Sequence, residues 1–139
     1  MASIATAIGV AIGVWQIRES SKVAQTQFED SLDQQYRHLT HGIPVDALIG
    51  QTVSEQQWPA TRELIYNYLD LCNEQVFLRS KRKVKRDTWQ DWNAGMRANL
   101  RKPAFRQVWD EVKAAAPGSF SFLERLENDQ FAIDPVKWS

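Results

Sequence analysis

Hydrophobic residues recur with helical spacing over the first third of the chain. From residue 24 to residue 39, apolar side chains come every three or four positions, so they share one face of an α-helix. These residues are Ala24, Phe28, Leu32, Tyr36 and Leu39. The segment contains no proline, and it leads into Gly42 and Pro44, a pair typical of a helix C-terminus. The pattern predicts a single helix from about residue 3 to residue 40.

The next apolar pattern predicts the central helix of a bundle. Residues 44–49 indicate one short helical turn, closed by Gly50. Ser54 and Gln57 then have the spacing of a capping box, which predicts a helix that runs from there to about Arg79. Its apolar residues form a wide face: Leu64, Ile65, Tyr68, Leu69, Leu71, Cys72, Val76 and Leu78. A helix with so wide an apolar face is expected in the middle of the fold.

Three shorter helices are predicted in the rest of the chain. Asp87 is a plausible N-cap for the first of them, and Pro103 suits the first position of the second. The first has a stripe expected to be buried, made of Trp89, Trp92, Met96 and Leu100. Ser119 or Ser121 is expected to cap the last helix, and residues 131–139 are expected to be extended. No strand pattern of useful length occurs, so the predicted fold class is all-α.

The first 17 residues contain no charged side chain and predict a transmembrane helix. As a helix they would span about 25 Å, slightly less than a hydrocarbon core of about 30 Å. Trp15 has the place of an interfacial tryptophan, and Arg18 and Lys22 follow the run. A buried soluble helix is the main alternative. A cleaved signal peptide is disfavoured, because no basic residue precedes the run.

The expected organisation therefore has three parts. Residues 1–17 form the transmembrane segment, residues 18–130 a small cytoplasmic helical bundle, and residues 131–139 a tail. Because the basic residues follow the apolar run, the N-terminus is expected outside the cytoplasm. The apolar run is only marginally hydrophobic, so a neighbouring helix would help it to stay in a membrane. Three small residues lie four positions apart and predict a ridge for docking such a helix: Ala5, Gly9 and Gly13. The alternative is that this ridge simply faces lipid.

The 139-residue chain has no net charge, but its charges are segregated. Residues 79–106 contain 10 basic and 2 acidic side chains, whereas the flanking parts of the domain are acidic. If the first two long helices are antiparallel, the connector 79–86 returns toward the membrane face. Contact with anionic lipid head groups or an acidic partner is then predicted for Arg18, Lys22, Arg79, Lys81, Arg82, Lys83, Lys85 and Arg86. A solvated loop is the alternative, and nucleic acid is disfavoured because no aromatic residues are interleaved.

Sites of chemistry are not evident, so no cofactor, metal or catalytic residue is predicted. His38 and His41 provide only two of the four ligands of a structural zinc site. Three carboxylates share a helical face that is more typical of a solvated surface than of acid–base catalysis; these are Glu63, Asp70 and Glu74. The single cysteine, Cys72, is expected to be an inert core residue in a reducing compartment. The spacing of Trp89, Trp92 and Trp109 favours core packing over a ligand pocket.

Several short motifs resemble a family of uncharacterised bacterial proteins with an N-terminal membrane helix and a small cytoplasmic helical domain. They are residues 43–50 (IPVDALIG), residues 69–78 (LDLCNEQVFL) and Thr88-Trp89 with Trp92. The resemblance covers most of the chain and implies a bacterial inner-membrane location. None of these motifs is a catalytic signature, so the resemblance implies an architecture and no activity.

The function expected from the sequence is that of a non-catalytic accessory or interaction subunit of a larger membrane protein complex. Other membrane protein subunits are its expected partners, and self-association is left open. The alternative is a peripheral module that binds anionic lipid or signals through the basic connector 79–86. An enzyme with an unrecognised site is the third hypothesis.

Overall fold

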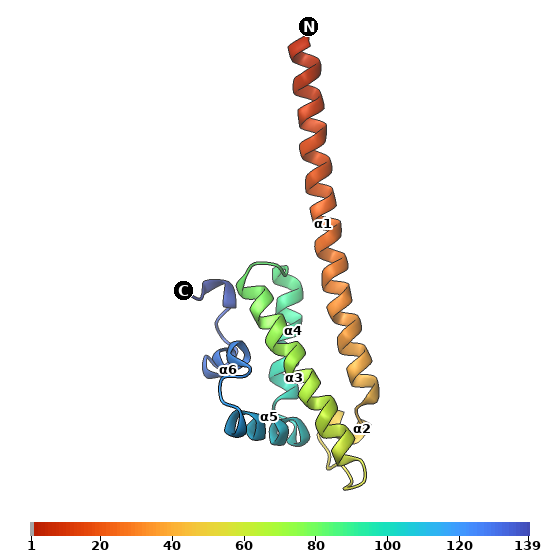
Figure 1. Ribbon diagram of the computed structural model, residues 1–139, viewed down its shortest axis with the longest axis vertical. Coiled ribbons are helices and arrows are strands. Elements are labelled where there is room, and N and C mark those ends of the chain that lie inside the picture. The colour runs from red at the N-terminus through yellow and green to blue at the C-terminus, as the bar shows by residue number, and fades with distance from the viewer. Residues whose placement is uncertain (1) are drawn as a thin grey trace.

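The computed structural model describes residues 2–139, with side chains from residue 8 onward, and over this range helices are joined by loops and no strand occurs (Figure 1). The elements are α1 (Ala2–Gly42), α2 (Val45–Leu48), α3 (Trp58–Ser80), α4 (Arg86–Asn99), α5 (Pro103–Ala115), α6 (Ser121–Asn128) and the 3-10 turn η1 (Pro135–Lys137). The all-α prediction is confirmed, and so is the single long helix at the start of the chain.

Within residues 2–139, none of the helices has the length and apolar character needed to cross a membrane. The transmembrane part of the predicted architecture therefore gains no support from the structure.

Helix α3 is the central element, as its wide apolar face predicts. The other elements pack around it, with α1 on one side and α5, α6 and the η1 turn on other sides (Figure 1). Ile65, Leu69, Cys72 and Val76 of α3 are completely shielded from solvent. They pack in one core with residues from α2, α4, α5 and α6, and Leu39 of α1 packs against this core.

Gly42 ends α1 for a reason other than the expected one. A C-terminal glycine commonly adopts a left-handed backbone, but here the requirement is close packing. A Cβ at Gly42 would lie 3.0 Å from Cδ1 of Leu64 on α3. The small residue therefore lets the end of α1 approach the start of α3.

Three helix starts differ from the sequence-based expectation. Helix α3 begins at Trp58, with Gln57 and not Ser54 as its N-cap residue. Helix α4 begins at Arg86, with Lys85 as its N-cap residue, so Asp87 lies inside the first turn. Neither expected serine caps α6, which follows Phe120. Instead, Oδ1 of Asn73 on α3 accepts hydrogen bonds from the backbone N–H groups of Phe122 (3.0 Å) and Leu123 (3.1 Å). The cap comes from a neighbouring helix, which a local sequence pattern cannot reveal.

The tail beyond residue 130 is folded onto the bundle and is not simply extended. The η1 turn packs against α3, and Pro135 within it is buried. The side chain of Asp134 accepts a hydrogen bond from the Val136 N–H (3.2 Å), which starts this turn. The tail therefore contributes to the packing around α3.

Candidate functional site

The N-terminal half of α1 projects well beyond the bundle (Figure 1). We call residues 8–24 the stalk. Within the stalk, residues 8–17 contain six large apolar side chains that are 44–68% exposed, namely Ile8, Val10, Ile12, Val14, Trp15 and Ile17. At 3.6 residues per turn these positions surround most of the helix and leave open the sector that holds Gly9 and Gly13. A helix that is apolar all round is normally buried, so the stalk lacks the cover that its composition requires.

The small-residue ridge lies on this uncovered stalk. A Cβ added at Gly9 or at Gly13 would meet no atom within 4 Å. The side chain of Ala5, the third predicted ridge residue, is outside the described side chains. The two glycines therefore leave a strip of backbone that another helix could approach closely.

Below the stalk, α1 packs mainly against α3, and two acidic side chains also join it to the connector and α4. Glu29 is only 5% exposed, and its carboxylate accepts hydrogen bonds from the Lys85 N–H (2.6 Å) and from the Thr88 hydroxyl (2.9 Å). It therefore caps α4 from another helix. Asp33 accepts a hydrogen bond from Nε1 of Trp92 at 2.8 Å. The sequence showed Glu29 and Asp33 only as polar residues next to the apolar stripe of this helix, so these two contacts were not predicted.

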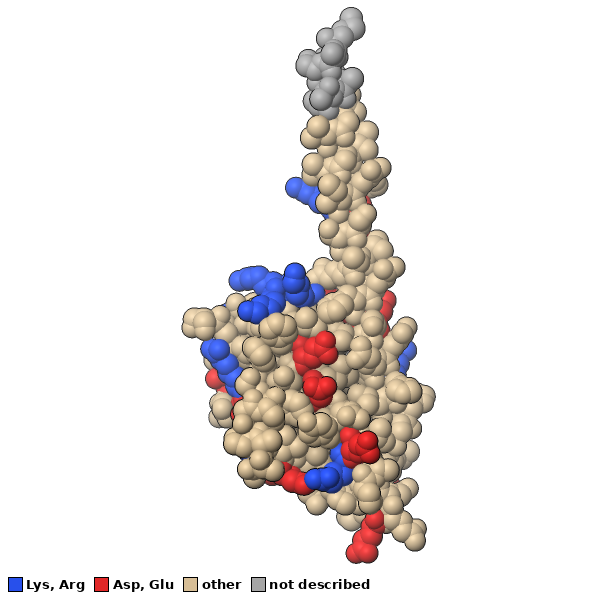
Figure 2. Space-filling view, viewed as in Figure 1, with Lys and Arg blue, Asp and Glu red and all other residues tan. Residues whose placement is uncertain are grey.

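The basic connector between α3 and α4 lies at the end of the bundle from which the stalk leaves, as the antiparallel arrangement predicts. Nε2 of Gln25 reaches the carbonyl oxygen of Lys83 (3.5 Å), and Nζ of Lys85 bonds to the hydroxyl of Thr26 (2.9 Å). Basic side chains gather at this end of the bundle (Figure 2). Residues 18 and 26 are about 12 Å apart along the helix axis. The connector thus lies about two helical turns below Arg18.

The residues of the connector divide into two groups. Arg79 is buried, with its guanidinium bonded to both carboxylate oxygens of Asp134 (2.9 and 2.6 Å) and to the Val84 carbonyl (2.7 Å). It fastens the connector and the tail to α3 and is not part of the exposed surface. The exposed residues, which we call the basic collar, are Lys81, Arg82, Lys83, Lys85 and Arg86.

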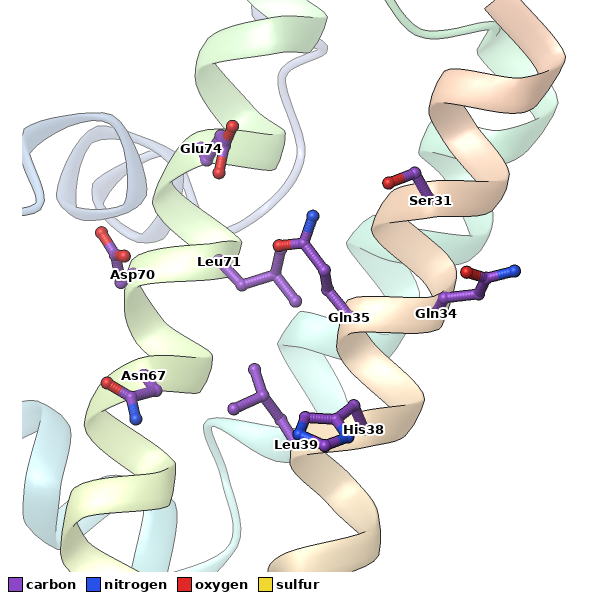
Figure 3. A pocket seen from close by; sticks show the side chains of 9 residues that line it. All are labelled: Ser31, Gln34, Gln35, His38, Leu39, Asn67, Asp70, Leu71 and Glu74. Atoms are coloured by element: carbon purple, nitrogen blue, oxygen red, sulfur yellow. The ribbon is translucent and has the colours of Figure 1, made fainter.

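An open groove separates α1 from α3 (Figure 3). Asp70 and Glu74 line it from α3 and His38 lines it from α1, but neither Glu63 nor His41 does. Among the residues that the structure describes, no hydrogen bond joins His38 to these carboxylates, and no group of three potential metal ligands occurs.

Cys72 is completely buried in the core next to Tyr68. Burial raises the pKa of the Cys72 thiol to about 12, although a hydrogen bond with Tyr68 partly opposes this. Because the thiolate is the reactive form of cysteine, Cys72 acts here as a small apolar core residue.

No protein-family model, no curated protein and no solved structure matches the chain. The resemblance to membrane-anchored bacterial proteins and the bacterial origin therefore stay predictions.

Proposed function

We propose that this protein is a non-catalytic accessory subunit of a larger membrane protein complex. In this proposal the N-terminal part of α1 enters the inner membrane of a bacterium and the helical domain lies on the cytoplasmic side. The uncovered stalk is the observation that carries the proposal. Moving the six exposed apolar side chains of residues 8–17 out of water would be favourable by on the order of 10 kcal/mol.

The shortness of the apolar run favours a partner over lipid alone. The charge-free segment of 17 residues is shorter than a membrane helix usually is. A helix packed on the ridge would cover part of the stalk and add van der Waals contacts. Gly9 and Gly13 provide the close approach that such packing requires, and nothing else in the described part of the chain occupies it. The helix of another membrane subunit is the proposed occupant, and a second copy of this chain is the competing one.

Gly13→Leu tests the docking step without harming the chain itself. The added side chain meets open space, and leucine favours a helix by nearly 1 kcal/mol over glycine. Ala11→Leu is the matched control, because Ala11 is exposed on the opposite side of the stalk. We expect the wild-type protein and the control to sediment with membranes and to elute from mild detergent in a particle larger than one chain. The Gly13→Leu protein should stay in the membrane but elute as a monomer.

Each result has a definite consequence. A wild-type protein found in the soluble fraction would contradict the membrane attachment. A wild-type protein that elutes alone as a monomer would contradict the docking. A particle containing only this chain would replace the accessory role by self-association. Equal behaviour of Gly13→Leu and Ala11→Leu would show that the ridge is not the docking surface.

A second candidate function, binding of anionic lipid, is favoured by the position of the basic collar. The collar faces the side from which the apolar stalk leaves, and Arg18 and Lys22 continue it along the stalk. Each basic residue near an anionic surface contributes about 1 kcal/mol, and this falls off over a Debye length of about 10 Å. Since the collar lies about 12 Å below Arg18, only part of that energy is available.

Neutralising two collar residues measures this contribution. We expect Lys81→Gln with Lys83→Gln to reduce the preference for anionic over zwitterionic vesicles by roughly 2- to 5-fold, equivalent to about 0.5–1 kcal/mol. Arg97→Gln with Arg101→Gln is the matched control, because these exposed residues lie at the other end of α4. Equal vesicle preference in both double variants would rule out a role of the collar in lipid binding.

A further inference from the structure

A small pocket lies where α1, α3 and α4 meet, separate from the stalk and from the groove of Figure 3. Its volume is about 160 Å³, and it is more enclosed than that groove. Its walls come from all three helices and include Asp33 and Tyr36 of α1, Tyr68 and Gln75 of α3, and Asp91 and Trp92 of α4. The pocket is large enough for a group of a few heavy atoms and too small for a nucleotide or a sugar.

Three aromatic residues form much of its wall. Tyr36 and Tyr68 lie with their ring centroids 6.1 Å apart, and Trp92 comes from the third helix. The bond from Nε1 of Trp92 to Asp33 holds the indole in place. Aromatic walls gathered from several elements are the usual receptor for quaternary ammonium groups, since the ring faces attract a cation and tolerate its methyl groups.

The charged residues of the pocket have one sign. Asp33 and Asp91 both line it, and no lysine, arginine or histidine does. Such a wall repels an anion and favours a cation. An inorganic cation would need several oxygen ligands, whereas the described residues contain no group of three acidic, histidine or cysteine side chains that could hold a metal. The preferred cation is therefore an organic one.

Gln75 can provide one polar contact to a ligand in the pocket. This residue is 5% exposed and lines the pocket, yet its side-chain amide makes no hydrogen bond to another described residue. Its amide nitrogen and oxygen are not among the fully buried atoms that lack a hydrogen-bond partner, so they reach solvent and can bond to a polar group inside the pocket. A ligand with one polar group beside its cationic centre would satisfy it.

We propose that this pocket binds a small quaternary ammonium ion of about the size of choline. The aromatic wall contacts the methylated nitrogen, the two carboxylates balance its charge, and Gln75 bonds to its polar end. This binding is independent of the proposed membrane attachment, because the pocket belongs to the bundle.

The test uses the full-length protein in a maltoside detergent, which has no ammonium group. Choline is compared with 3,3-dimethylbutan-1-ol, which has the same shape without the charge, and sodium chloride keeps the ionic strength constant. We follow the indole N–H signal of Trp92 by NMR, assigned with Trp92→Phe. Choline should shift it saturably and bind roughly tenfold more tightly than the neutral alcohol. No saturable shift, or equal affinity for both compounds, would overturn the proposal.

Two variants place the site. Asp33→Asn removes the charge but keeps an oxygen for the Trp92 bond, so the fold is retained. It should weaken choline binding by about fivefold. Asp30→Asn is the control, since Asp30 is exposed on α1 and does not line the pocket. Unchanged affinity in Asp33→Asn would show that choline binds elsewhere. Because the wild-type comparison needs no membrane, its failure and the failure of the docking proposal are separate results.

Discussion

Replacing Trp109 by alanine is expected to lower the free energy of unfolding by about 3–5 kcal/mol. Trp109 is completely buried on α5, and its ring stacks against Phe120 with centroids 6.5 Å apart. Its Nε1 donates a hydrogen bond to Glu127 on α6 at 2.9 Å. The substitution removes the largest buried side chain and leaves a cavity between α5 and α6. It also removes one hydrogen-bond donor from the carboxylate of Glu127.

Denaturant unfolding in a mild non-ionic detergent measures this loss. Trp109→Phe keeps most of the ring and removes the N–H group, so we expect a smaller loss of about 1–2 kcal/mol. Trp15→Ala is the control for an exposed tryptophan, since Trp15 is 62% exposed on the stalk. It should change stability by less than about 0.5 kcal/mol. A loss below about 1 kcal/mol in Trp109→Ala would contradict the described packing of α5 on α6.

Arg79→Met is expected to lower the free energy of unfolding by about 3 kcal/mol. Removing one partner of a buried ion pair costs about 3–5 kcal/mol, and the Asp134 side chain still reaches water here, with 23% of its surface exposed. The variant also leaves the carbonyl of Val84 without its donor. We therefore expect the connector and the tail to loosen together. Hydrogen exchange of the Val136 amide should become faster than in the wild type.

Arg82→Met is the matched control, because Arg82 is an exposed residue of the same connector. It should leave stability and exchange nearly unchanged. Loosening in both variants would mean that the overall charge of the connector matters and the Arg79–Asp134 pair does not.

The same ion pair sets part of the pH dependence of stability. Hydrogen bonds from Arg79 lower the pKa of Asp134 below its ordinary value of about 4. A carboxyl whose pKa is lower in the folded state stabilises the fold above its ordinary pKa, and this stabilisation is lost as the pH falls through the lowered value. The wild type should therefore lose more stability than Arg79→Met as the pH is lowered below about 4.

Helix lengths and the central position of α3 could be predicted because they depend on local periodicity and on the width of an apolar face. The start of α5 at Pro103 was predicted for the same reason, since proline suits the first helical position. The starts of α4 and α6 were not predictable. Their caps are Glu29 and Asn73, which come from helices about 50 residues away in the chain. A rule based on neighbouring residues assigned the caps to nearby serine and aspartate residues.

The candidate surfaces show the same division. The stalk and the collar could be located from runs of apolar and basic residues. Charge alone did not separate Arg79 from the exposed collar, because its partner Asp134 lies 55 residues further along the chain. The pocket between three helices was not predictable either. Tyr36 and Trp92 each belong to an apolar stripe, and only packing shows that they line one space.

The unbroken course of α1 has a mechanical consequence. No glycine or proline occurs from residue 14 to residue 41, so this part of the helix has no built-in hinge. The 16 positions between Gly13 and Glu29 correspond to a turn of about 160° around the helix axis. The ridge therefore faces almost directly away from the side where Glu29 grips the bundle. If a partner helix rotated the ridge about the axis of α1, the bundle would therefore rotate with it as one rigid body.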